Sequence, residues 1–230
     1  MPKHIAFIMD GNRRWAKERG WSPMTGHGAM RKTLQSLLIR CSKLNIKAVS
    51  VYAFSTENWR RPTEEVDFLM KMYEDLLRID AEVLLSLGCR ISVMGEKTKL
   101  PDSLQKACTD IEEKSSLNSG THVNYAINYS GKHDIIQACK NIAAKVKDGI
   151  LVPTQISEDL FKHELGTKMI EFPYPDLVVR TSGEIRLSNF MLWQMAYSEL
   201  YFTAKMFPDF EEDDLMKALL AFQDKCECNM

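Results

Sequence analysis

Five consecutive polar residues follow the first apolar run of the chain and carry the clearest chemistry in the sequence. They are Asp10, Gly11, Asn12, Arg13 and Arg14. A carboxylate suits a hard cation, glycine lets a ligand approach the backbone, and arginines beside the free N–H groups of a starting helix suit phosphate oxygens. The pattern predicts a site for a phosphate–Mg²⁺ complex. An Asp-Gly turn with an asparagine cap and solvated arginines explains the same residues equally well.

A second arginine cluster lies near the C-terminal end. Arg180, Arg186 and Ser188 flank Gly183, and the planar forks of two arginines suit a second phosphate group. The alternative is a polar loop that holds an internal ion pair through Glu184. The residues alone favour the phosphate site over that alternative.

Three further positions could support this chemistry. His27 follows a glycine at a predicted helix start, where a neutral imidazole could handle a proton, although an isolated histidine is more often structural. Glu199 precedes the last predicted strand and could reach a shared cation, although such a carboxylate is more often a surface group. Arg61 ends a polar segment that begins directly after the second predicted strand.

The elements that must position these residues alternate along the chain. Short apolar runs predict strands at 4–9, 48–54, 90–94, 122–128, 177–181 and 200–203. Helical patterns are found at 28–44, 63–87, 100–116, 133–146, 157–165, 192–197 and 211–224. This alternation predicts a single α/β domain with a six-stranded, mostly parallel sheet surrounded by helices. Ligands of such sheets bind beyond the carboxyl ends of the strands, which is where the two arginine clusters fall.

Composition limits the class of protein. With 230 residues, of which 45% are hydrophobic, the chain can bury one sizeable core. A formal net charge of -1 argues against a protein that coats nucleic acid or an anionic membrane. No apolar run approaches the roughly 20 residues that span a bilayer, and no secretory signal is visible, so the chain is expected to be soluble. The six cysteines include no CxxC pair, and Cys226 and Cys228 lack further nearby metal ligands.

Several catalytic motifs are absent from the sequence. It contains no GxGxxG, GxxxxGK[ST], GxSxG or HExxH pattern, which argues against dinucleotide-binding folds, P-loop enzymes, α/β-hydrolases and zinc proteases. Two apolar stripes, Leu34/Leu37/Leu38 and Leu69/Met72/Tyr73, favour ordinary core packing, although they could instead line an apolar substrate channel.

From His4 to Phe222 the chain resembles the cis-prenyltransferase family. The resemblance rests on six ordered segments: HIAFIMDGNRRWAK (4–17), GH (26–27), YAFSTENWRRP (52–62), RTSGEIRLSNF (180–190), ELYF (199–202) and FPDF (207–210). The DDxxD motif of the trans-type synthases is absent, since Asp213-Asp214 is followed by Leu-Met-Lys. The family resemblance implies a Mg²⁺-dependent homodimeric enzyme with the six-stranded fold predicted above.

The resemblance also implies roles for individual residues. It assigns Asp10 and Glu199 to Mg²⁺, and Arg180, Arg186 and Ser188 to the second diphosphate. It assigns catalysis or proton handling to His27, Ser55 and Asn58. It assigns Asn12, Arg14 and Arg61 to holding or activating the allylic diphosphate, and Trp59 to substrate positioning. The remaining substrate-binding positions are Gly11, Arg13 and Trp15.

Two departures from the family pattern bear on the substrates. Pro23 stands where the family usually has an arginine that clamps the allylic diphosphate, and the chain ends in AFQDKCECNM rather than a basic Arg-x-Gly tail. We therefore expect a short-chain enzyme that uses dimethylallyl diphosphate. The plant-type motifs resemble a branch of the family that joins two of these molecules head-to-middle, so the resemblance favours lavandulyl diphosphate, a C10 product.

Two alternatives remain at this stage. The first is regular neryl or Z,Z-farnesyl diphosphate synthesis with isopentenyl diphosphate. The second is a non-catalytic partner subunit, which is disfavoured because such subunits lose the aspartate and asparagine of the first motif. The plant-type motifs suggest a plastid location, with any leader lying ahead of this sequence, and otherwise the cytoplasm.

Overall fold

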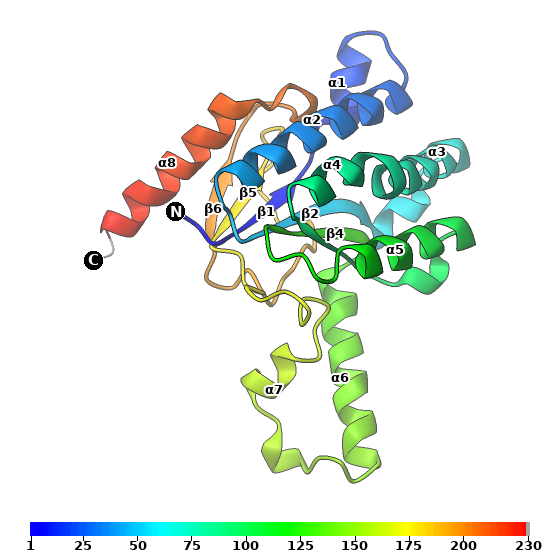
Figure 1. Ribbon diagram of the computed structural model, residues 1–230, viewed down its shortest axis with the longest axis vertical. Coiled ribbons are helices and arrows are strands. Elements are labelled where there is room, and N and C mark those ends of the chain that lie inside the picture. Colours follow the sequence, from blue (N-terminus) through cyan, green and yellow to red (C-terminus); the bar gives the residue numbers. More distant parts are fainter. Residues whose placement is uncertain (229–230) are drawn as a thin grey trace.

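The chain folds around one six-stranded sheet (Figure 1). The structure is a computed structural model that describes residues 1–228, with side chains described as far as residue 225. Strand order is β3-β4-β2-β1-β5-β6, and all five strand pairs are parallel. The strands are β1 His4–Ile8, β2 Ala48–Ser55, β3 Arg90–Met94, β4 His122–Tyr129, β5 Leu177–Arg180 and β6 Glu199–Phe202.

Eight α-helices connect and flank these strands. They are α1 Asn12–Glu18, α2 Pro23–Lys43, α3 Thr63–Asp75, α4 Ala81–Ser86, α5 Asp102–Lys114, α6 Gly131–Lys147, α7 Glu158–Lys162 and α8 Glu212–Cys228. The sheet is covered on both faces, which explains why β1 and β5, mostly apolar strands, are buried throughout. The predicted six-stranded α/β fold is confirmed, and the sheet is entirely rather than mostly parallel.

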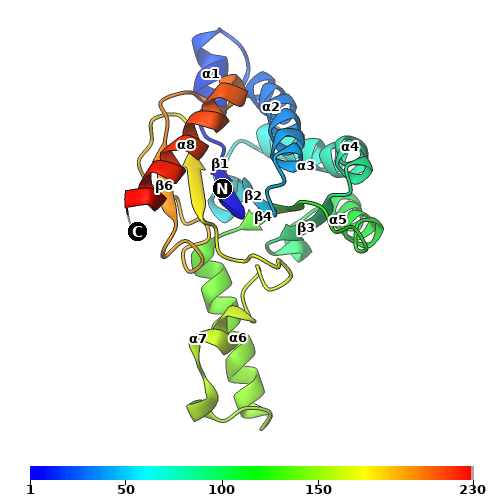
Figure 2. The same cartoon turned by 60° about the vertical axis from the view of Figure 1, so that its left-hand side comes forward.

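The two faces of the sheet are covered differently. One face packs against α2, α3, α5 and α8 in a large apolar core that includes Phe7, Leu34 and Leu69. The opposite face packs against the irregular segment after β5, where Phe190 and Met191 are fully buried. Helices α6 and α7 project from the sheet as an arm (Figure 2).

One predicted helix is wrong. Residues 192–197 form turns instead, directly after Met191, whose φ of 39° breaks the right-handed helical path. The segment is held in place by Gln194, whose side chain donates to Asp134 at 3.0 Å and to Thr167 at 3.2 Å. Tertiary hydrogen bonds therefore override the apolar periodicity here.

The helix predicted at 63–87 is continuous but irregular. A widened turn at Leu76–Asp80 separates α3 from α4. Such turns admit one extra residue per turn and shift the following residues around the helix axis. Leu76 and Leu77 both remain buried in the core as a result.

Candidate active site

A cavity of about 230 Å³ opens at the carboxyl ends of β1, β2 and β5. Nine of the predicted site residues line it: Asp10, Asn12, His27, Ser55, Asn58, Arg61, Arg180, Arg186 and Ser188. They come from segments up to 178 positions apart in the chain, counted from Asp10 to Ser188. Convergence of strand ends in a parallel sheet therefore brings the two predicted phosphate clusters to one cavity.

Asp10 follows β1 and faces the last residue of β5. Its Oδ2 accepts a hydrogen bond from Arg180 at 2.8 Å, and its Oδ1 accepts from the Gly11 N–H at 2.7 Å. Partial burial opposes ionisation, but these hydrogen bonds outweigh it and hold the pKa of Asp10 below its ordinary value. Asp10 is therefore an ionised carboxylate at neutral pH.

Gly11 makes this turn possible. Its φ of 99° lies in the region that L side chains rarely adopt, and a Cβ there would lie 2.9 Å from the Cβ of Ser182. The glycine therefore lets the first motif pass directly against the loop after β5.

Arg180 is 3% exposed and organises the second cluster. Its guanidinium donates to Asp10, to the Ser188 hydroxyl at 2.7 Å and to the carbonyl of Arg186. Its Nε has no hydrogen-bond partner among the described residues. A buried arginine that still has a free donor is suited to an anionic ligand.

The loop after β5 is strained where it approaches the cavity. Four residues other than glycine have positive φ there, namely Ser182, Ser188, Asn189 and Met191. Each such conformation costs on the order of 1–3 kcal/mol and persists only when surrounding contacts hold it. Strain concentrated in one loop is typical of a functional site.

The loop after β5 contains the internal ion pair through Glu184 that the sequence offered as the alternative to a phosphate site. Glu184 pairs with Arg186 and lies 3.5 Å from Arg14. Arg14 also donates to the Ser182 hydroxyl at 2.7 Å, so it lies with the second cluster rather than with Arg61. Both arginines keep more than a third of their side-chain surface exposed and remain accessible to an anion.

Glu65 is a site residue that the sequence reasoning missed. This buried carboxylate of α3 contacts His27 Nε2 at 3.0 Å, Arg61 at 3.2 Å and Arg13 at 3.6 Å. The i,i+4 spacing of Arg61 and Glu65 at a helix start is the signal that could have indicated it. Glu65 therefore positions both the imidazole and one arginine of the cavity.

His27 is neutral in this setting. Burial lowers its pKa below the ordinary value, although the hydrogen bond with Glu65 opposes the shift. Nε2 faces Glu65, and Nδ1 is buried without a hydrogen-bond partner among the described residues. If Nε2 carries the proton, Nδ1 is a free acceptor.

Two amides complete the polar lining. The Asn12 Nδ2 group donates to the Met9 carbonyl at 3.2 Å, which leaves the buried Oδ1 without a described partner. The Asn58 Oδ1 accepts from the Ser55 N–H at 3.0 Å and fixes the turn after β2. A free carboxamide oxygen close to Asp10 in sequence offers a second oxygen ligand.

The residues present fit a magnesium–diphosphate complex better than a protein-only metal site. No group of three metal-ligating side chains occurs among the described residues. Mg²⁺ in proteins commonly takes one or two carboxylates together with substrate phosphates. Asp10 and the free Asn12 oxygen supply that kind of incomplete set, which phosphate oxygens would complete.

Glu199 does not lie beside Asp10 in the same chain, and its sharing of this cation stays a prediction. Glu199 starts β6, and its partner in the sheet is Leu177 at the start of β5. Three residues, or about 10 Å of strand, separate it from the level of Arg180. It pairs instead with Lys225 of α8 at 2.7 Å.

Five predicted substrate-binding residues do not line the cavity: Gly11, Arg13, Arg14, Trp15 and Trp59. The Trp15 indole donates to Asp209 at 2.7 Å, and the Trp59 indole donates to Asn128 at 2.8 Å. Both tryptophans tie neighbouring segments together. The side chains of Cys226 and Cys228 lie outside the described residues.

Apolar side chains close the cavity on the side of the core. Ile8, Met30 and Tyr73 line it, and the Tyr73 hydroxyl donates to the Ala53 carbonyl at 2.5 Å. Most residues of the two apolar stripes lie in the core, as the sequence favoured over a channel wall: Leu34, Leu37, Leu38, Leu69 and Met72. Tyr73 alone of the two stripes also reaches the cavity.

Comparison with known proteins gives a consistent result. Residues 8–227 match a family model described as putative undecaprenyl diphosphate synthase. The chain is 51% identical to the chloroplastic (2Z,6Z)-farnesyl diphosphate synthase of Solanum lycopersicum, over 97% of this chain and 77% of that protein.

Two solved structures share the fold. Lavandulyl diphosphate synthase from Lavandula x intermedia, solved with dimethylallyl diphosphate, matches with a TM-score of 0.94 and 45% identity, covering 96% of this chain and 94% of that one. A probable undecaprenyl diphosphate synthase from Campylobacter jejuni matches with a TM-score of 0.78 and 31% identity, covering 97% and 95%.

Proposed function

This chain belongs to the cis-prenyltransferase family, and we propose that it is a short-chain member that joins two molecules of dimethylallyl diphosphate head-to-middle. The products are lavandulyl diphosphate and free diphosphate. The observation that carries the short-chain assignment is the small cavity, in which two clusters of phosphate-binding residues share one apolar wall.

Cavity size favours small substrates. Pockets for drug-sized ligands usually measure about 300–1,000 Å³, whereas this cavity measures about 230 Å³. Met30 and Tyr73 line it on the side of the core. Five-carbon chains suit such a site.

Different residues bind each of the two diphosphate groups. Arg61 and Asn12 hold the first diphosphate, and Arg180, Arg186 and Ser188 hold the second. Mg²⁺ held by Asp10 would supply further neutralisation of the departing diphosphate. Fixed positive groups aimed at developing negative charge are worth several kcal/mol of transition-state stabilisation.

The proton lost at the end of the reaction needs an acceptor. His27 offers its free Nδ1 inside the cavity, with Glu65 behind it to stabilise the imidazolium that forms. The Ser55 and Asn58 groups lie in the same lining, and an oxygen of the departing diphosphate is the other available acceptor.

The head-to-middle reaction is supported by the close structural match to lavandulyl diphosphate synthase over nearly the whole chain. A second candidate is supported by the 51% identity to the (2Z,6Z)-farnesyl diphosphate synthase. In that candidate, isopentenyl diphosphate occupies the second site and gives neryl or Z,Z-farnesyl diphosphate.

Product analysis separates the two candidates. The purified chain is incubated with Mg²⁺ and dimethylallyl diphosphate alone, then with isopentenyl diphosphate added, and dephosphorylated products are identified by gas chromatography. A branched C10 alcohol from dimethylallyl diphosphate alone supports the proposal. No product without isopentenyl diphosphate, and regular Z-chains with it, would establish the second candidate.

We also propose a homodimer and a plastid location. The exposed Tyr174 and Tyr197 and the half-buried Trp193 rim a hollow of about 600 Å³ close to the edge strand β6, and such apolar patches usually mark interaction surfaces. The chloroplastic relatives support the plastid. Within residues 1–228, no helix is long and apolar enough to cross a membrane.

A further inference from the structure

A second polar hollow lies at the opposite end of the sheet from the candidate active site. It measures about 390 Å³ and is lined by the first residues of three neighbouring strands, Ala48 of β2, Arg90 of β3 and His122 of β4. We call it the amino-end pocket. One strand length, about 20 Å, separates it from the candidate active site.

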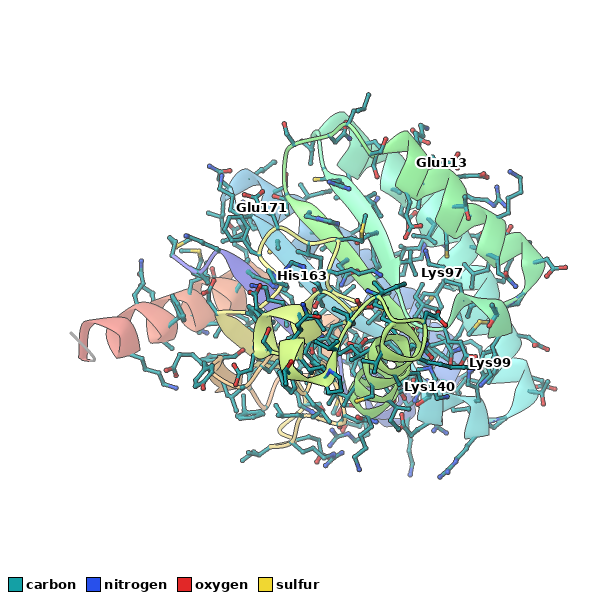
Figure 3. All side chains as sticks on the ribbon, turned by 90° about the horizontal axis from the view of Figure 1, so that it is seen from below. Lys97, Lys99, Glu113, Lys140, His163 and Glu171 are labelled. Carbon is teal, nitrogen blue, oxygen red and sulfur yellow. The ribbon has the colours of Figure 1, made fainter. Side chains whose placement is uncertain are left out.

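Positive charge predominates in this pocket. Lys47, Arg90 and Lys168 line it, against the single carboxylate of Glu171. In the view of Figure 3, Glu171 lies on the loop between α7 and β5. None of these four side chains takes part in an ion pair among the described residues.

Arg90 is unusual among the arginines of the described chain. Nine of the eleven lie within 4.0 Å of a carboxylate, and the exceptions are Arg60 and Arg90. Arg60 is exposed to solvent, whereas Arg90 is half-buried. A half-buried guanidinium without a described partner has lost hydration that an anionic ligand could replace.

His122 is a buried imidazole that lines the pocket next to Arg90. The residue is 7% exposed, and its Nε2 is fixed by the Ser92 hydroxyl at 2.9 Å, which in turn contacts the Asn124 amide at 3.1 Å. Because the Ser92 hydroxyl donates to Asn124, it accepts from Nε2, and the ring is held in one orientation beside the pocket.

One wall of the pocket is apolar. Met169, Ile170 and Phe172 line it, and the Lys3 ammonium lies 5.4 Å from the centre of the Phe172 ring. The volume exceeds that of a bare phosphate, so this wall has room for an organic group. The pocket therefore combines cationic and apolar surface as a phosphate ester requires.

We propose that the amino-end pocket binds a small phosphate-bearing anion, with Arg90 and Lys168 contacting the phosphate, His122 lying beside it, and Phe172 packing against the organic group. The site is separate from the reaction cavity and does not depend on the proposed activity. The same chemistry has two sources, a soluble phosphate compound or the headgroup of an anionic lipid.

The histidine ring provides a readout specific to this pocket. In proton NMR spectra, the ring C–H resonance of His122 is assigned by its loss in His122→Asn. It is then followed while inorganic phosphate or diphosphate is added without Mg²⁺. We expect a saturable shift of His122 and none for the exposed His163 of the arm (Figure 3). Binding in the candidate active site does not interfere, because His122 is not part of it.

Matched variants test the assignment of the cations. Arg90→Gln should weaken the apparent affinity about tenfold or more, which is the scale of one charge-assisted hydrogen bond. Arg78→Gln removes a partly exposed arginine on the helical segment after α3 and should leave the affinity unchanged. A His122 shift that Arg90→Gln leaves unaltered would overturn the proposal.

Vesicles distinguish the two sources. Co-sedimentation with phosphatidylcholine vesicles that contain phosphatidic acid, compared with phosphatidylcholine alone, tests the lipid headgroup. The site would be assigned to a lipid headgroup if the protein sediments with the phosphatidic acid vesicles, Arg90→Gln abolishes this binding, and free phosphates do not shift the His122 resonance. Absence of both responses at millimolar phosphate would show that the pocket binds no phosphate group.

Discussion

At the scale of single residues, the site depends on buried charges that the protein only partly satisfies. Arg180 donates three hydrogen bonds but keeps a free Nε, and Asn12 and His27 each keep one unpartnered polar atom. Buried polar groups are normally hydrogen-bonded. Three buried polar atoms without a described partner around one cavity indicate groups that can bind a ligand.

Asp10→Ala should reduce turnover about 10²-fold or more, because it removes the carboxylate that would hold the cation. It also deprives Arg180 of its only described charge partner, so we expect a loss of about 1–3 kcal/mol in the free energy of unfolding. Steady-state assays and denaturant melts check both effects. Near-normal turnover of a folded Asp10→Ala protein would remove Asp10 from the mechanism.

Three buried histidines predict acid sensitivity of the fold. Burial lowers the pKa of His4 to about 3 and of His122 to about 4, and it lowers the pKa of His27 below its ordinary value. Between about pH 6.5 and 4 the unfolded chain binds these protons and the folded chain does not. Stability should therefore fall as the pH falls through this window, by about 1.4 kcal/mol per pH unit for each of His4 and His122, and His27 adds to the loss in the same direction.

Denaturant melts at pH 7.5 and 5.0 measure this loss. His122→Gln should flatten the pH dependence by one histidine's share, whereas His163→Gln at an exposed position should leave it as in the wild type. Equal slopes for wild type and His122→Gln would contradict the assignment of a neutral buried imidazole.

The sequence identified most of the residues that line the cavity, because strand ends in a parallel sheet follow from the order of elements. It could not place Glu65, whose importance comes from packing between α2 and α3, nor separate Arg14 from Arg61. The assignment of Glu199 to the cation of Asp10 came from the family resemblance, whereas a residue that begins a parallel strand lies at the opposite edge of the sheet from Asp10 in the same chain.

At the scale of elements, close contact between α1 and α2 aligns the first motif with the cavity. A Cβ at Gly26 would lie 2.1 Å from the carbonyl oxygen of Asn12, whereas a Cβ at Gly28 would meet nothing within 4 Å. Two glycines in the same helix therefore serve different purposes. Only Gly26 is required by packing.

Gly26→Ala should force α1 away from α2, destabilise the protein by about 1–3 kcal/mol and displace Asn12, with a matching loss of turnover. Gly28→Ala should raise stability by up to about 1 kcal/mol through helix propensity and leave turnover unchanged. Thermal melts and assays on both variants provide the comparison. Equal behaviour of the two would show that this helix contact does not control the site.

At the scale of the whole molecule, the apolar surface beside β6 predicts self-association. Tyr197 is fully exposed, and symmetric pairing of such a patch is the commonest route to a dimer. Light scattering should give a dimer for the wild type and for Leu117→Glu, an exposed control remote in sequence, and a monomer for Tyr197→Glu. A monomeric wild type at micromolar concentration would contradict the proposed homodimer.

The central claim is that one small cavity holds two diphosphate groups at separate arginine clusters. Calorimetric titration with the unreactive thiolo-diphosphate analogue of dimethylallyl diphosphate, in the presence of Mg²⁺, counts these sites directly. The account predicts two equivalents per wild-type chain and one tight equivalent for Arg186→Ala, with the other weakened about tenfold to a hundredfold. A single equivalent in the wild type, or equal weakening of both sites in Arg61→Ala and Arg186→Ala, would contradict it.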